Sequence, residues 1–137
     1  MKKYSIFLLL LFFAYTKSAN SQVTKKIIIE KLTGKTGTKA WFMVGTKANT
    51  PDRVDGDMKF VFEKKTNLFR IYRCNAVKKW VEIISQNWEI LNYDPESKSP
   101  LRFDLKIAGR IVFYDFKEGY SKLHLQPAGW KDPVILY

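Results

Sequence analysis

The sequence predicts an all-β domain, an antiparallel up-and-down meander of about eight short strands that closes into a barrel. From residue 39 onward, apolar and polar residues alternate in short runs, which is the period of a half-buried strand. Most of these runs are separated by two to four residues rich in Gly, Asn, Asp or Pro. Such short connections join antiparallel neighbours, because a parallel crossover needs about a dozen residues. Closure into a barrel would leave no bare sheet edge.

The first 21 residues have the layout of a secretory signal peptide. Two lysines follow Met1, residues 6–14 form an unbroken apolar run, and small polar residues come next. We expect cleavage between Ser21 and Gln22, which leaves residues 22–137 as one secreted or periplasmic domain. A buried N-terminal helix is the alternative interpretation. No Cys follows the apolar run to carry a lipid, and no later stretch is long enough for a transmembrane helix.

The elements that follow are assigned from the alternation of apolar and polar residues. Residues 23–32 could form a short helix or a strand. The apolar phase changes between two consecutive runs, 79–84 and 87–91, and a bulge or tight turn at residues 85–87 would restore the register. The expected strands are residues 39–44, 58–63, 68–74, 79–84, 87–91, 101–108, 111–116, 120–126 and 133–137.

One face of these strands carries the large apolar side chains and is expected to point inward. About eight strands is the size at which a barrel can hold one small ligand. The alternative is that these bulky side chains fill the interior completely. The candidate cavity residues are Trp41, Met58, Phe60, Phe62, Trp88, Phe103, Leu105, Ile107, Leu123 and Leu125.

The order of elements resembles that of a small secreted bacterial lipocalin-like protein of the calycin type. The resemblance covers most of the chain after the signal peptide. The segment 34–41 places Trp41 in the region of the family's Gly-x-Trp motif, although no Gly lies two residues before it. Family members often place a late-strand Arg over this Trp; Arg110 is too early here, and Lys131 is the nearest counterpart. The resemblance implies a cup-shaped barrel that holds a small apolar or amphipathic ligand without catalysis.

The charge balance suggests an alternative function. The chain has 24 Lys and Arg against 13 Asp and Glu, and a net charge of about +8 remains without the first 21 residues. A basic surface favours polyanions such as an anionic glycan, lipopolysaccharide or extracellular DNA. Solubility is the other interpretation, since the lysines are scattered along the sequence, and secretion argues against an intracellular nucleic acid. The candidate polyanion contacts are Arg70, Arg73, Lys78 and Lys79.

No motif indicates catalysis, a cofactor or a metal site. The chain has one Cys, Cys74, and one His, His124, so Cys-based zinc sites and multi-histidine sites are excluded. Nothing around Cys74 resembles a catalytic cysteine signature. The spacing of Asp52, Asp55 and Asp57 differs from that of a calcium loop and is typical of turns. We therefore expect a non-catalytic protein. A hydrolase and an outer-membrane barrel remain alternatives, although the expected strands are shorter than membrane strands.

Overall fold

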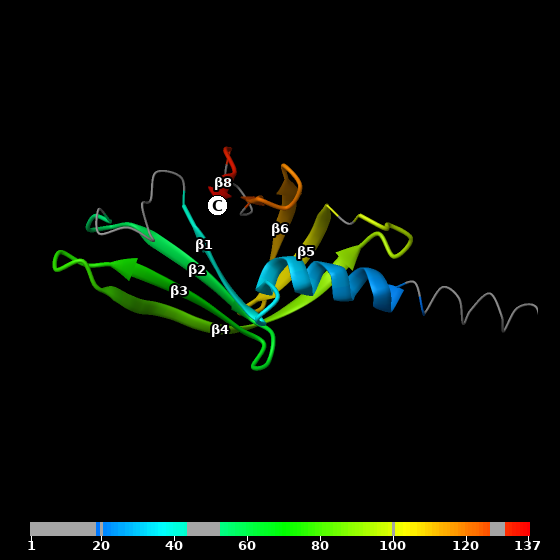
Figure 1. The fold of residues 1–137 in the computed structure, drawn as a ribbon, viewed down its shortest axis with the longest axis horizontal. Helices are drawn as coiled ribbons and strands as arrows, with labels where there is room; N and C mark the ends of the chain where they lie inside the picture. Colours follow the sequence, from blue (N-terminus) through cyan, green and yellow to red (C-terminus); the bar gives the residue numbers. More distant parts are fainter. Residues whose placement is uncertain (1–18, 20, 44–52, 100, 127–130) are drawn as a thin grey trace, which may run out of the picture.

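The computed structural model describes residues 19, 21–43, 53–99, 101–126 and 131–137. Within these residues a helix over 21–33 precedes eight strands (Figure 1). The all-β prediction is therefore confirmed, and residues 23–32 are helical. No helix in the described part of the chain is both long and apolar enough to cross a membrane. The strands are β1 Thr38–Phe42, β2 Met58–Glu63, β3 Leu68–Cys74, β4 Trp80–Tyr93, β5 Arg102–Ile107, β6 Arg110–Lys117, β7 Lys122–Gln126 and β8 Val134–Leu136.

Several sequence predictions fall on residues that the structure does not describe. Of the expected signal peptide, residues 1–18 and 20 lie outside the described residues. The unbroken run of helical residues begins at Ser21. Residues 44–52 and 127–130, which fall mostly between expected strands, also lie outside the described residues. The signal peptide and its cleavage site therefore stay predictions.

The eight strands form one antiparallel sheet in the order of the sequence, as expected of an up-and-down meander. The sheet is not closed into a barrel, so this part of the prediction is wrong. The outer strands β1 and β8 meet through one isolated bridge, between Met43 and Leu136. Beside this bridge, Phe42 and Tyr137 exchange backbone hydrogen bonds of 2.9 and 2.8 Å. This contact is too short to form a continuous ladder.

Strand β4 explains why the sheet stays open. Its residues 80–87 pair with β3, whereas residues 88–93 pair with β5, so each half has a neighbour on one side. Figure 1 shows the result, in which β1 to β3 and the first half of β4 diverge from β5 and β6. The two separate strands expected at 79–84 and 87–91 are one strand, and residues 85–87 continue it. The register shifts lie elsewhere: between β3 and β4 the shift falls between Ile71 and Tyr72. Between β4 and β5 it falls between Ile90 and Tyr93.

The helix lies against the inner face of the sheet and completes the core. Its residues at four-residue spacing, Thr24, Ile28 and Leu32, are all buried, which is the pattern of a helix with one face packed. Ile28 and Leu32 join the cluster formed by the inward rings of the strands. The Trp41 Nε1 group donates a 2.9 Å hydrogen bond to the Leu32 carbonyl, fixing the helix end on β1. Gly34 ends the helix with a φ of 68°, a conformation that suits glycine.

Candidate functional site

The structure brings the ten predicted cavity residues together on one face of the sheet. Eight of them are buried in a single cluster, and Met58 and Ile107 pack against it half-buried. Their rings contact one another closely: the Phe62 centroid lies 5.7 Å from that of Trp88 and 4.9 Å from that of Phe69. The helix residues Ile28 and Leu32 belong to the same cluster. This face is thus the hydrophobic core, and a role in ligand binding stays a prediction.

The four residues predicted to contact a polyanion do not form one patch. Arg70 is engaged by two acids, with its Nη1 3.2 Å from Glu63 Oε1 and its Nε 3.7 Å from Glu82 Oε2. Arg73 lies on the opposite face of β3 from Arg70. The two are three residues apart, and successive side chains of a strand alternate between its faces. Lys78 and Lys79 belong to the exposed turn between β3 and β4. Arg70 and Arg73 therefore cannot act as neighbours.

A different group of lysines gathers where the helix meets β1. The turn over residues 34–37 lies beside the β2–β3 turn, and the Lys64 amide donates a 2.8 Å hydrogen bond to the Gly37 carbonyl. Gly37 has a φ of 83°, which side chains rarely allow. The two turns enclose a hollow of about 870 Å³, which we call the lysine hollow. It is lined by Glu30, Lys31, Gly34, Lys35, Thr36, Gly37, Thr38, Lys64 and Lys65.

The lysine hollow carries more positive than negative charge, since its lining holds four lysines and one acid, Glu30. Among the ion pairs of the described residues, none includes the four lysines that line it. Lys39 adds a fifth cation at its edge, with its Nζ 3.4 Å from the centre of the Trp41 ring. Partial burial and the nearby Lys31 lower the pKa of Lys39. The carbonyls at the helix end offset part of this charge. An anion in the hollow would meet these lysines, of which Lys31 already has its Nζ 4.7 Å from the centre of the Tyr120 ring.

Sequence reasoning did not find this group because its members come from separate elements. Lys31 lies on the helix, Lys35 in the following turn, and Lys64 and Lys65 in a hairpin turn almost thirty residues later. The four-residue spacing of Lys31, Lys35 and Lys39 could have signalled a shared side if the helix had been expected to continue. The pair Lys31 and Lys35 meets the pair Lys64 and Lys65 only because the end of the helix packs against the β2–β3 turn.

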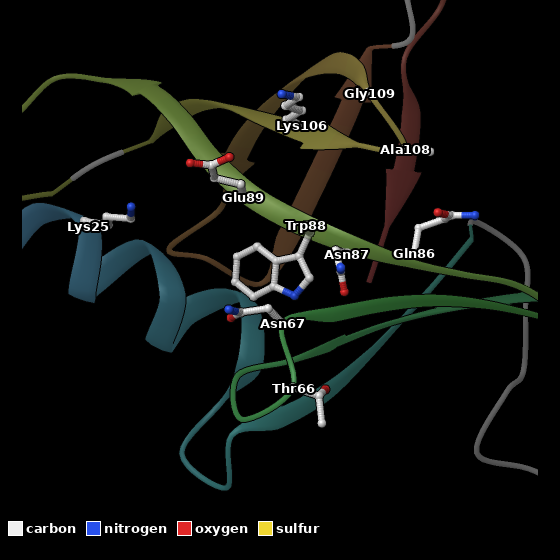
Figure 2. Close-up of a pocket in the computed structure, with 10 residues that line it drawn as sticks. All are labelled: Lys25, Thr66, Asn67, Gln86, Asn87, Trp88, Glu89, Lys106, Ala108 and Gly109. Atoms are coloured by element: carbon white, nitrogen blue, oxygen red, sulfur yellow. The ribbon is translucent and has the colours of Figure 1, made fainter.

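The β2–β3 turn also lines a second hollow, whose residues Figure 2 shows. We call it the amide hollow; its volume is about 650 Å³. Trp88 lies at its centre and donates a 3.3 Å hydrogen bond from Nε1 to the Glu63 carbonyl. Lys64 and Lys65 line the first hollow, whereas Thr66 and Asn67 of the same turn line the second. The full lining is Lys25, Thr66, Asn67, Gln86, Asn87, Trp88, Glu89, Lys106, Ala108 and Gly109.

The amide hollow offers several polar groups that have no protein partner. The side-chain amides of Asn67, Gln86 and Asn87 make no hydrogen bond with the described residues. The ammonium groups of Lys25 and Lys106 form no ion pair with them either. A carboxamide can donate and accept hydrogen bonds, but Gln86 and Asn87 are adjacent on β4 and project to opposite faces of the strand.

The residues considered for catalysis are far apart in the sheet. Cys74 is buried at the end of β3, whereas His124 lies in β7, and these strands are not neighbours. Asp57 accepts a 2.9 Å hydrogen bond from the Val54 amide, a role typical of a turn residue. In the described part of the chain, no group of three or more His, Cys, Asp or Glu could hold a metal. Asp52 lies outside the described residues.

Comparison of the chain with protein-family models, with curated proteins and with solved structures finds no match. The lipocalin-like resemblance therefore stays a prediction. What the fold and the site define is an open antiparallel sheet packed on one helix, with two hollows that are both lined in part by its β2–β3 turn.

Proposed function

We propose that this protein is a non-catalytic binding protein, secreted or periplasmic, that binds a polyanion in the lysine hollow. The observation that carries the proposal is the gathering of four lysines that form no ion pair with the described residues, in a lining whose one acid is Glu30: Lys31, Lys35, Lys64 and Lys65. Like charges held close together raise the electrostatic free energy of the folded protein. An anionic ligand would relieve this repulsion. The proposal keeps the polyanion class suggested by the net charge and moves it to other residues.

The test is a titration of the protein with a sulfated polysaccharide at about 50 mM and 500 mM salt. Binding that depends on several lysines should weaken steeply with salt, because salt screens exposed charges and counterion release drives the association. The double variant K64E/K65E should lose most of the affinity. K78E/K79E is the matched control, since it makes the same change in net charge on a different exposed turn.

Two outcomes would contradict this proposal. The first is equal loss of affinity in both double variants, which would mean that net charge alone attracts the ligand. The second is binding that does not change with salt.

The inner face of β4 favours a second candidate, the binding of a small amphipathic ligand. Val81 and Ile84 are 46% and 39% exposed, although they share the face of half-buried Met58 and Ile71. They lie in the half of β4 that β5 does not flank. An apolar ligand could cover them, as in the cup of a lipocalin-like protein. Saturable binding of an apolar fluorescent probe at 0.5 M salt, lost in Ile84→Lys, would support this candidate, and absence of saturation would contradict it.

A further inference from the structure

We infer that the first half of β4 is the surface through which two copies of this protein associate, each copy adding this strand to the other's sheet. Residues 80–87 pair with β3 on one edge, and the pairing of β4 with β5 begins only at Trp88. Figure 1 shows this half as the outermost strand of the diverging part of the sheet. None of the described strands therefore covers its second edge, which we call the open edge.

The open edge presents backbone hydrogen-bonding groups at defined residues. The Trp88 amide donates a 3.0 Å hydrogen bond to a carbonyl of the β2–β3 turn, so the backbone of Trp88 faces β3. Because successive residues of a strand face alternate edges, the backbone groups of Ser85 face away from β3. The same count from Lys79, whose carbonyl accepts a 2.9 Å hydrogen bond from the Asn75 amide, turns Glu82 outward. The two counts differ in phase because the register with β3 shifts between them.

The side chains beside the open edge lack the features that usually protect an edge strand. Residues 81–87 are exposed without interruption, on both faces of the strand. Three of them are large and apolar: Val81, Ile83 and Ile84 are 46%, 49% and 39% exposed. Edge strands are commonly protected by lysine or proline, and residues 80–87 contain neither. The register shift with β3 bends the strand but adds no charge. This half of β4 is thus suited to pairing with a further strand.

The charge around the open edge favours a second copy of the chain as its occupant. The protein is strongly basic, with 24 Lys and Arg against 13 Asp and Glu, so two copies repel wherever their cations face each other. Residues 80–97 are the longest run of the sequence without Lys or Arg. The one acid of the open edge, Glu82, has its Oε2 3.7 Å from Arg70 Nε, which offsets its charge. Two copies can therefore approach at this edge with little repulsion, whereas a polyanion finds no cation on it.

Two antiparallel copies of this strand are also complementary to each other. A two-fold axis between residues 83 and 84 places Glu82 opposite Ser85 of the second copy, and Ser85 opposite its Glu82. Each pair joins two residues whose backbone groups face outward, so every N–H group finds a carbonyl. The exposed Ile83 then lies opposite Ile84 of the second copy, and burial of their apolar surface adds to the association. Contacts that are the same on both copies are typical of symmetric dimers.

The experiment is sedimentation velocity of the protein without polyanion, from about 1 μM to about 200 μM, because a short strand pair makes a small interface. We expect a dimer whose fraction rises with concentration. It should be at least as stable at about 500 mM salt as at about 50 mM, because salt screens the repulsion between basic copies. Polyanion binding should weaken over the same range, so either result can fail without the other. Amide hydrogen exchange at Glu82 and Ser85 should slow as the dimer forms.

Ser85→Pro tests the open edge through its backbone. It removes an outward N–H group, and proline is tolerated where the N–H side of an edge strand faces solvent. The dissociation constant of the dimer should rise at least about tenfold, because the two-fold axis doubles the loss. Ser85→Ala keeps the N–H group and should dimerise like the wild type.

Ile83→Lys tests the same edge without proline and gives an answer if Ser85→Pro does not fold. A lysine on an edge strand opposes pairing, so this variant should also weaken the dimer at least about tenfold. Ile111→Lys is the matched control, because Ile111 is 47% exposed on β6, and it should dimerise like the wild type.

Three outcomes would overturn the inference. The first is a protein that stays monomeric over the whole concentration range. The second is a dimer that Ile83→Lys weakens no more than Ile111→Lys does, because the two copies would then meet through another surface. The third is a monomer that binds an extended apolar peptide along β4, which would make a different chain the occupant of the open edge.

Discussion

The cations on the outer face of the sheet and those of the lysine hollow differ in their partners. On the outer face, Asp115 Oδ2 lies 3.6 Å from Arg102 Nε and 2.5 Å from Lys117 Nζ. Lys122 Nζ likewise lies 2.6 Å from Glu118 Oε1. In the lysine hollow, Lys31 and its three neighbours form no ion pair with the described residues. Four lysines without an ion pair to the described residues therefore share one hollow, whereas other such cations, Lys106 and Arg110 among them, lie on other elements.

The largest effect should come from breaking the helix contact that holds the two lysine pairs together. Leu32 is fully buried next to Trp41, so Leu32→Ala should lower the free energy of unfolding by about 2–5 kcal/mol. Urea denaturation measures this change. Lys26→Ala, on the exposed side of the same helix, should stay within about 0.5 kcal/mol of the wild type. A similar cost for both would mean that Leu32 does not anchor the helix.

Adding carboxylates to the lysine hollow should pair its lysines with acids, as the cations of the outer face already are. Thr36 and Thr38 line the hollow and are exposed, so T36E/T38E would place two carboxylates among the lysines. Affinity for a sulfated polysaccharide should fall at least about tenfold at low salt, and the salt dependence should become shallower. Calorimetry at several salt concentrations measures both. T36Q/T38Q is the matched control and should bind like the wild type.

Removing a paired cation should have a much smaller effect on binding. Arg70→Ala takes away the partner of Glu63 and Glu82 on the outer face. We expect stability to fall by roughly 0–1 kcal/mol, as is typical of exposed or half-exposed ion pairs. Affinity for the polysaccharide should change by less than about twofold, because two carboxylates already offset the charge of Arg70. A tenfold loss of affinity in this variant would contradict the contrast between the two regions.

The smallest effect concerns pH. Burial and the charge of Lys31 lower the pKa of Lys39, whereas the hydrogen bond to Glu118 raises the pKa of Lys122. As pH rises toward 10.5, Lys39 should therefore lose its charge before Lys122 does. Polyanion affinity should begin to fall below pH 10.5, and Lys39→Arg should move this decline to higher pH, because Arg stays charged. If the wild-type protein and Lys39→Arg have the same dependence of affinity on pH from pH 8 to 11, Lys39 contributes no charge to binding.

Alternation along single strands was enough to predict most of the sheet. Residues 58–63 and 101–108 show period two clearly, and both form strands with the expected inward faces. The pattern misled at residues 79–91, because β4 changes partners in its middle and leaves Val81 and Ile84 exposed. Alternation reports which face is buried and carries no information on how far two neighbouring strands overlap. Barrel closure depends on that overlap and could not be predicted.

The candidate site depended on contacts between elements, which explains why the sequence indicated its chemistry and missed its position. The net charge pointed to a polyanion, yet Arg70 was selected for its basic and aromatic neighbours in sequence. Its acid partner Glu82 lies on the next strand, so the pairing becomes visible only once the strands are in register. The lysines of the hollow were overlooked for the same reason.

The attachment of the helix has a consequence for the order in which the chain acquires its structure. Thr24 donates a 2.9 Å hydrogen bond to the Pro95 carbonyl, 71 residues away. A ribosome adds about 5–20 residues each second, so the helix waits several seconds for this partner. Until then Ile28 and Leu32 have no complete core to enter. The helix is synthesised before every strand but is among the last elements to reach its final place, and such distant contacts slow folding.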